Sequence, residues 1–237
     1  MKMKILVSLV LFALSFAARG QGETRIGIKA GITSATVFGP DLNQLSQGGD
    51  PSSLSGFHFG LFVNSKLAKN FWIKSEVLTI QKGSVLQIKD HWGQRYSSNF
   101  KSQYVEVYPF SPTFHWKGLQ ALAGPYVSML LSASQQVKDS LGVLTTNHSI
   151  FGTAPALSNY RQKLDAGFVL GLEYELQFGI SIGARYTYGF VPLIENAAAI
   201  PVKNAPELPQ QKVYNKSLSI SVGYSFGKRK ADPPVKH

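Results

Sequence analysis

Residues 217–226 alternate strictly between two kinds of side chain, and this alternation constrains the fold more than any other feature of the sequence. The even positions are apolar (Leu218, Ile220, Val222, Tyr224 and Phe226), and the odd positions are all serine or glycine. Successive side chains of a β-strand point to opposite faces, so the pattern predicts a strand with one face in an apolar medium.

The same period of two recurs along the chain. The clearest further segments are residues 25–33, 56–64, 166–176 and 180–190. Three more segments read as strands less cleanly: about 71–83, 102–114 and 119–134. Prolines in the last two (Pro109, Pro112 and Pro125) leave their register undefined, because proline in a strand marks a bulge or a missing ladder bond. The sequence therefore predicts eight strands.

The connections between these strands alternate between long and short. Long ones cover about 39–54, 84–99, 135–159 and 192–212, and short ones cover about 65–70, 115–118 and 177–179. Long loops at one end and tight turns at the other are typical of bacterial outer-membrane barrels. We predict an all-β fold, an eight-stranded antiparallel up-and-down transmembrane β-barrel with four long outer loops and three short periplasmic turns.

The N-terminus has the features of an export signal. Lys2 and Lys4 precede an apolar core at residues 5–18, which is too short to cross a bilayer as a helix. We predict a signal peptide over residues 1–20, cleaved between Gly20 and Gln21; an uncleaved anchor is the alternative. The barrel would then occupy residues 21–226, followed by a short basic periplasmic tail at 227–237.

The composition helps to decide which face of the barrel meets water. Only 16% of the residues are charged, and the polar face of the strands consists mostly of Ser, Gly and Thr. A soluble barrel would carry a dense charged surface around an apolar interior. We therefore expect the apolar face to meet lipid, with a soluble lipocalin-like periplasmic binder as the less favoured alternative.

Aromatic side chains of the apolar face gather near the strand ends. They are Phe57, Phe59, Phe71, Tyr174, Tyr186, Tyr188, Phe190, Tyr224 and Phe226. Aromatic girdles of this kind flank the apolar band of membrane barrels, so we expect two belts at the lipid interfaces. Aromatics scattered through a soluble β core are the alternative.

Charged residues fall on the opposite, inward face. They are Arg25, Lys29, Lys74, Glu76, Glu106, Asp165, Glu173, Glu175 and Arg185. An eight-stranded barrel is just wide enough for its side chains to fill it, and buried charges of opposite sign must pair. We expect a network that fills the lumen; an ion or solute path is the alternative.

Several functional classes find no support in the sequence. The chain has no cysteine, and its five histidines are dispersed without metal-ligand spacing. We find no catalytic or nucleotide-binding motif, and we expect no catalytic, metal or cofactor site and no enzyme. The net charge of +11 is spread along the chain, which argues against a nucleic-acid partner.

Short motifs in a fixed order resemble the small outer-membrane β-barrel family of Gram-negative bacteria, in particular its PorT-like "porin family" group. They lie at 27–31 (GIKAG), 76–83 (EVLTIQKG), 104–107 (YVEV), 123–126 (AGPY), 165–168 (DAGF), 184–189 (ARYTYG) and 222–226 (VGYSF). Tyr108 before Pro109 and the tail after Phe226 depart from the family pattern.

The resemblance implies a protein of the cell outer membrane with lipids as its neighbours, and we expect a monomer. It also implies that Tyr224 and Phe226 at the end of the last strand act as the signal for the barrel insertion machinery, although Phe226 would serve equally as a girdle aromatic. We expect a structural or surface-interaction protein, with a narrow porin as the alternative. The sequence does not identify a ligand of the outer loops.

Overall fold

The computed structural model describes residues 23–42, 51–89, 95–138, 143–147, 164–176, 178–193 and 212–226. The predicted signal peptide at 1–20 and the predicted tail at 227–237 lie outside the described residues. Within the described part of the chain, no helix is long and apolar enough to cross a membrane.

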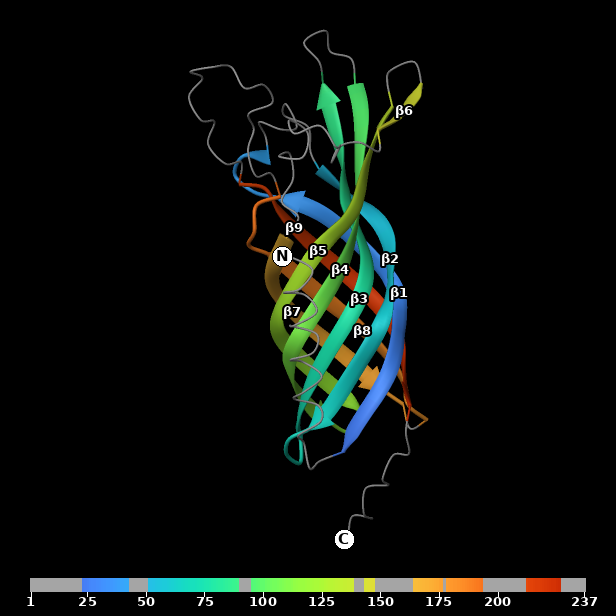
Figure 1. The fold of residues 1–237 in the computed structure, drawn as a ribbon, viewed down its shortest axis with the longest axis vertical. Coiled ribbons are helices and arrows are strands. Elements are labelled where there is room, and N and C mark those ends of the chain that lie inside the picture. Colours follow the sequence, from blue (N-terminus) through green and yellow to red (C-terminus); the bar gives the residue numbers. More distant parts are fainter. Residues whose placement is uncertain are drawn as a thin grey trace.

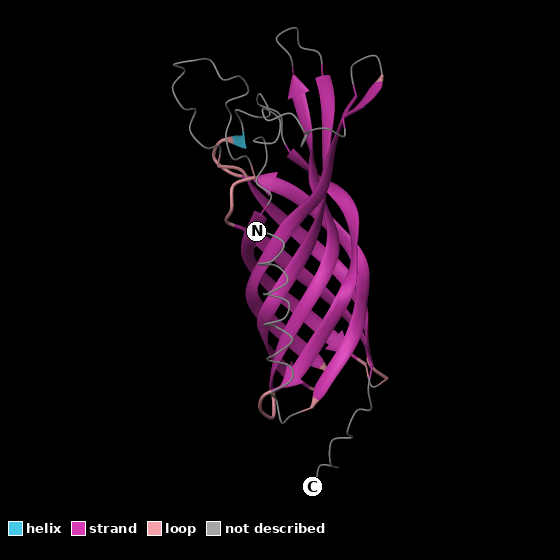
Figure 2. Cartoon of the chain, in the orientation of Figure 1, coloured by secondary structure: helices cyan, strands magenta, loops and turns pink. Residues whose placement is uncertain are grey.

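Nine antiparallel strands make up almost the whole described structure (Figure 2). They are β1 (Thr24–Phe38), β2 (Pro51–Lys66), β3 (Phe71–Lys89), β4 (Arg95–Trp116), β5 (Leu119–Lys138), β6 (Leu144–Asn147), β7 (Leu164–Glu175), β8 (Ile180–Gly189) and β9 (Tyr214–Phe226). Eight of them form a closed ring, because β1 pairs with β9 and β4 pairs with β5. The predicted eight-stranded barrel is confirmed. The short strand β6 lies outside the ring and pairs with the end of β5.

The alternation along each strand sorts side chains between the lumen and the outer surface. Leu218, Ile220 and Val222 on β9 are 51–55% exposed on the outside, whereas Ser219 and Ser221 between them are buried. Across the β1–β9 seam, Ile32 lies opposite Ile220 on the same outer face. The apolar face is therefore outside, the reverse of a lipocalin-like barrel.

The three connections at one end are tight, as predicted: residues 67–70, 117–118 and 176–179. The shortest joins β4 to β5 through Lys117 and Gly118, with φ values of 47° and 90°. Positive φ at both positions fits the right-handed twist of the two strands, and glycine adopts this conformation at little cost.

Strand β4 changes register at its prolines. Before Pro109 the even-numbered residues 104, 106 and 108 face the lumen. After Pro109 the odd-numbered residues Ser111 and Thr113 face it. The pairing with β3 shifts between Lys74 and Glu76, and Ser75 Oγ donates a hydrogen bond to the Pro109 carbonyl at 2.7 Å. The irregularity places both Tyr108 and Thr113 inside the barrel.

The second predicted outer loop, at 84–99, is mostly strand. Strand β3 continues to Lys89 and β4 begins at Arg95, and their ladder runs without a break up to the pair Lys89 and Arg95. The first loop is shorter than predicted in the same way, because β2 begins at Pro51; the third is displaced along the chain, because β5 continues to Lys138 and β7 begins only at Leu164. The upper parts of β3, β4 and β5, with β6 beside them, stand above the closed barrel (Figure 1).

Candidate functional site

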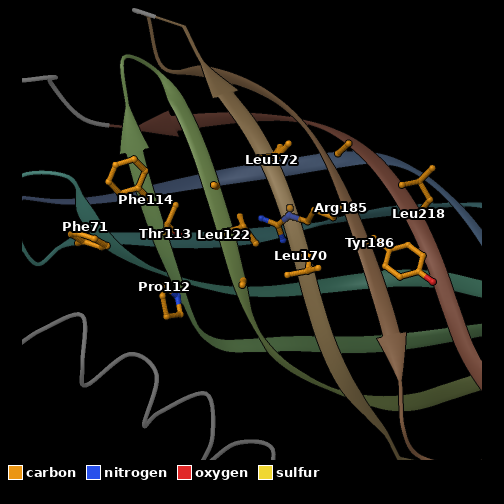
Figure 3. Close-up of a pocket in the computed structure, with 14 residues that line it drawn as sticks. Phe71, Pro112, Thr113, Phe114, Leu122, Leu170, Leu172, Arg185, Tyr186 and Leu218 are labelled. Carbon is orange, nitrogen blue, oxygen red and sulfur yellow. The ribbon is translucent and has the colours of Figure 1, made fainter.

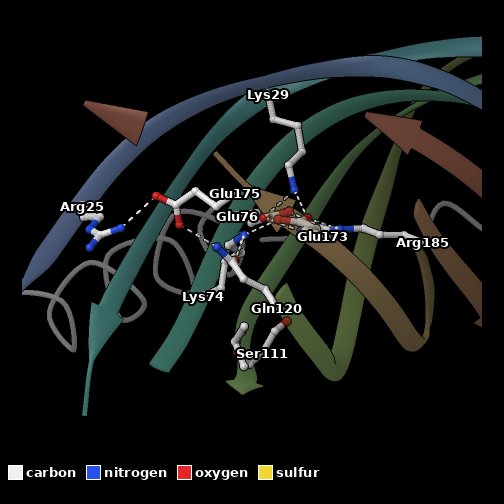
Figure 4. Close-up of polar contacts among 10 residues, drawn as sticks. Arg25, Lys29, Lys74, Glu76, Ser111, Gln120, Glu173, Glu175 and Arg185 are labelled. Carbon is white, nitrogen blue, oxygen red and sulfur yellow. Dashed lines mark hydrogen bonds and ion pairs between the residues drawn. The ribbon is translucent and has the colours of Figure 1, made fainter. Parts of the chain in front are cut away.

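Glu173 on β7 is the centre of a buried ion-pair network in the lower, turn-side half of the lumen (Figure 4). Its carboxylate accepts hydrogen bonds from Lys29 Nζ and Lys74 Nζ, each at 2.5 Å, and from Arg185 Nη2 at 2.6 Å. The three cations come from β1, β3 and β8, so one acidic side chain joins strands from all around the ring.

Arg185 extends this network to a second carboxylate. Its guanidinium binds Glu76 through both Nη atoms and Glu173 through Nε at 3.0 Å. Lys29 Nζ also reaches Glu76 Oε1 at 3.1 Å. The planar five-donor fork of arginine is suited to bridging two carboxylates in this way.

The network continues to the turn-side mouth of the barrel. Gln120 accepts from Lys74 Nζ at 3.2 Å and donates to Glu175 at 2.7 Å. Glu175 in turn pairs with Arg25 at 2.8 Å, and Arg25 pairs with Glu23 at the rim. We call the set formed by Arg25, Lys29, Lys74, Glu76, Gln120, Glu173, Glu175 and Arg185 the lower network.

A second polar group lies in the loop-side half of the lumen. Lys82 forms a buried ion pair with Glu106 and lies 3.7 Å from Asp165. Tyr108 donates its hydroxyl to Glu106, and Asp165 accepts from Tyr126 at 3.3 Å. Asn215 Nδ2 also donates to Asp165, at 3.0 Å. We call Lys82, Glu106, Tyr108, Tyr126, Asp165 and Asn215 the upper cluster.

An apolar layer lies between the two polar groups on the β3, β4, β5 and β7 side of the lumen, whereas β1, β2 and β9 on the opposite side contribute buried polar side chains. Leu78, Leu122 and Val169 pack inside the barrel with the rings of Tyr108 and Tyr126, and all five side chains are buried. On β3 the layer falls between Glu76 and Lys82, and on β7 it falls between Glu173 and Asp165.

Cations cover this layer on both sides. The Arg185 guanidinium carbon lies 5.4 Å from the Tyr108 ring centroid, and Lys82 Nζ lies 4.5 Å from that of Tyr126. Cation–π contacts in a desolvated interior are worth about 2 kcal/mol. The layer is therefore held in place by the polar groups on either side of it.

The buried charges balance. Apart from Glu23 at the rim, the ion pairs join five basic side chains to five acidic ones. Removing one partner of a buried pair typically costs about 3–5 kcal/mol, because the other charge is left uncompensated. Such an arrangement favours a fixed, filled lumen.

All nine charged residues assigned to the lumen from the sequence point inward. Glu106 and Asp165 belong to the upper cluster and the other seven to the lower network. Sequence reasoning missed Lys82, the partner of Glu106. It shares the parity of Lys74 and Glu76 on β3, and that signal would have identified it.

The nine aromatic residues assigned to the interfaces are all exposed on the outer wall, between 39% and 56%. Phe71, Tyr174 and Phe226 lie at or next to the turn ends of their strands. Phe59 lies seven residues before the end of β2 at Lys66, which places it about 18 Å higher for a strand tilted by about 40°. This height approaches the apolar band of about 25 Å in outer-membrane barrels.

The described residues contain no group of three or more His, Asp or Glu side chains arranged to hold a metal ion. Most polar groups of the lumen pair with one another, although Asp165 Oδ1, Asn215 Oδ1 and the Tyr104 hydroxyl have no hydrogen-bond partner among the described residues. The chemistry that this arrangement supports is electrostatic cross-linking of the barrel wall.

A family model described as "Outer membrane protein beta-barrel domain" matches residues 16–195. The chain belongs to this family. It is accordingly a protein of the outer membrane, with lipid around its apolar wall. The narrower likeness to the PorT-like group stays a prediction.

Solved structures of outer-membrane and surface proteins are similar to the chain at low sequence identity. Ail of Yersinia pestis, solved with the heparin analogue sucrose octasulfate, is 14% identical, with 86% of this chain and 99% of that chain covered and a TM-score of 0.39. The Neisserial surface protein NspA is 11% identical, with 85% and 97% covered and a TM-score of 0.43. OprG of Pseudomonas aeruginosa is 13% identical, with 88% and 99% covered and a TM-score of 0.36. Among curated proteins, none matches the chain.

Proposed function

We propose that the protein is a closed, non-conducting barrel that holds a rigid β-sheet outside the outer membrane for contact with other molecules. The observation that carries the proposal is the filled lumen. Two ion-paired groups occupy its two halves, and the apolar layer of Leu78, Leu122 and Val169 with two tyrosine rings lies between them. To cross the lumen, an ion would have to leave water and displace buried ion pairs whose charges already compensate one another.

The experiment that tests closure is planar-bilayer recording on the purified protein. The wild type should give no unitary conductance steps. The double variant Tyr108→Ala/Tyr126→Ala removes both rings of the apolar layer and should give small, measurable steps. Stable steps from the wild type would contradict the proposal and favour a narrow porin.

The sheet above the barrel supports the second half of the proposal. The β3–β4 ladder continues to Lys89 and Arg95, and β6 adds a further strand beside β5. Leu144 on this added strand is 56% exposed, and Val143 just before it is 57% exposed. Leu144 pairs with Lys138, 19 residues beyond the turn end of β5 and about 48 Å above it, well above the apolar band.

Exposed apolar side chains on an edge strand are typical of interaction surfaces, because an open ladder and apolar contacts together accept an extended segment of a partner. A photo-crosslinking amino acid at position 144 in intact cells should therefore give adducts with surface protein or polysaccharide. The same probe at Leu61 on the lipid-facing wall is the control and should give only lipid adducts. Identical adducts at both positions would argue against a surface contact at β6.

A further inference from the structure

The outer wall of the barrel carries a shallow apolar groove that crosses β4, β5, β7 and β8 (Figure 3). Its volume is about 640 Å³, and small side chains (Ala121, Ala123 and Ala184) make its floor. Phe114 and Tyr186 lie at opposite ends of the groove. Because these residues belong to the wall that meets lipid, the groove opens into the membrane.

The groove follows the hydrogen-bonding direction of the sheet. Its residues are cross-strand neighbours: Phe114 pairs with Ala121, Ala121 with Leu172, and Leu172 with Ala184. From β3 to β9 there are five inter-strand steps, or about 24 Å at about 4.8 Å each. With strands tilted by about 40°, the groove rises about 15 Å through the membrane. This is a little more than half of the apolar band of about 25 Å in outer-membrane barrels, the depth of about one leaflet.

The lower end of the groove lies at the periplasmic interface. Phe71 and Phe114 meet there edge to face, with ring centroids 5.4 Å apart, at the turn ends of β3 and β4. Trp116, two residues further along β4, is 56% exposed. Tryptophan with this exposure beside a membrane-facing groove marks the headgroup level.

Two lysines lie on the turns beneath this end. The β2–β3 turn is tied to the end of β4, just before the second turn, because His115 N donates a hydrogen bond to the Asn70 carbonyl at 2.8 Å. Lys69 and Lys117 are both exposed. Lys117 Nζ lies 5.5 Å from the Trp116 ring centroid, and neither lysine forms an ion pair with any described residue.

We propose that this groove binds one anionic phospholipid of the periplasmic leaflet, with an acyl chain along Ala121, Ala123 and Ala184 and its phosphate beside Lys69 and Lys117. The length of the groove fits one leaflet, and the two unpaired ammonium groups complement a phosphate. A second copy of the chain fits less well. Inserted in the same orientation, it would bring its own two lysines to the same level and place like charges together.

Native mass spectrometry of the full-length mature protein tests the proposal. The protein is released from detergent micelles that contain either phosphatidylglycerol or phosphatidylethanolamine. The wild type should retain one phosphatidylglycerol molecule. Ala123→Phe fills the floor and should lower this retention at least tenfold. Ala30→Phe makes the same change at an exposed outward position on β1, outside the groove, and should retain the lipid like the wild type.

The headgroup contact has its own variant. Lys69→Gln/Lys117→Gln should lower phosphatidylglycerol retention at least threefold and leave phosphatidylethanolamine unchanged. Ala184→Leu, a smaller filling of the same floor, replaces Ala123→Phe if that variant loses the heat-modifiable gel mobility of a folded barrel.

Three results would overturn the proposal. One is equal retention by the Ala123→Phe and Ala30→Phe variants. Another is a wild-type protein that retains neither lipid or both lipids equally. The third is a lipid-free dimer that dissociates on Ala123→Phe, which would make the groove an interface between two copies.

Discussion

Glu173 holds more of the lumen together than any other acidic residue of the lower network, because three cations converge on its carboxylate. Lys29 and Lys74 approach to 2.5 Å and Arg185 to 2.6 Å, and the glutamate side chain is 1% exposed. Low dielectric surroundings strengthen these pairs and raise the cost of leaving one charge alone. A neutral side chain at this position would leave Glu76 as the only acidic partner near Lys29 and Arg185.

The first prediction concerns this position. Glu173→Gln keeps the shape but removes the charge, and it should lower the free energy of unfolding by about 3–5 kcal/mol. Urea unfolding of the barrel in detergent, followed by heat-modifiable gel mobility, measures the change. Glu23→Gln is the matched control: this rim glutamate likewise pairs with an arginine, Arg25, but its side chain is 22% exposed, so the loss should stay below about 1 kcal/mol. Equal losses would mean that the network contributes little.

At the scale of the element, the distance of a lipid-facing residue from the turn end of its strand sets its expected depth in the membrane. Leu170 lies five residues from the turn end of β7 and is 62% exposed, which places it about 13 Å into the apolar band, near its middle. Ile182 lies on the same face of the neighbouring strand, but only two residues from the start of β8, about 5 Å into the band.

The second prediction follows from this difference in depth. Leu170→Arg should destabilise the inserted barrel by about 2–4 kcal/mol, whereas Ile182→Arg should cost about 1 kcal/mol or less, because arginine near the interface extends to the headgroups. Unfolding in lipid vesicles measures both. The assigned depths of these two residues would be wrong if Ile182→Arg were the more damaging change.

The sequence predicts strands well wherever one face meets lipid and the other the lumen, as on β9. The prediction stops at about residue 83 on β3, although the strand continues to Lys89. Above the membrane neither face of the sheet meets hydrocarbon, so Ser84, Val85 and Leu86 do not alternate between apolar and polar side chains. Only their backbone ladder with β4 shows that they are strand. The register around Pro109 was equally beyond reach, because it depends on the hydrogen bond from Ser75.

At the scale of the whole molecule, closure of the ring decides which charges meet. Lys29 and Glu173 are 144 residues apart in the sequence, and Arg185 and Glu76 are 109 apart. Parity alone assigns these side chains to the lumen, but their pairing depends on how far the strands are staggered around the ring. The inward set could therefore be predicted, and its division into a lower network and an upper cluster could not.

Closure also depends on the last strand, β9, whose free edge must pair with β1. Strand β9 ends with Tyr224 and Phe226 on the outer face, their ring centroids 5.2 Å apart, and Phe226 pairs with Ile26 of β1. An unpaired strand edge cannot enter hydrocarbon, so the terminal strand needs a templating partner until the ring closes. We propose that the insertion machinery supplies that partner and recognises the aromatic end of β9.

The last prediction separates this assembly role from a role as a girdle aromatic. Phe226→Ala should lower the amount of barrel inserted in cells severalfold. It should change the unfolding free energy of barrel refolded in detergent by less than about 1 kcal/mol, because Phe226 is 49% exposed on the outer wall and its removal leaves no cavity. Phe71→Ala is the matched control: Phe71 is also an exposed aromatic at a turn end, but on β3, and its loss should leave insertion close to wild type. Quantitative blotting of outer-membrane fractions measures insertion.

Deletion of residues 227–237 should leave insertion intact. If that deletion abolishes insertion while Phe226→Ala has no effect, the signal lies in the tail and β9 is recognised only as the partner of β1.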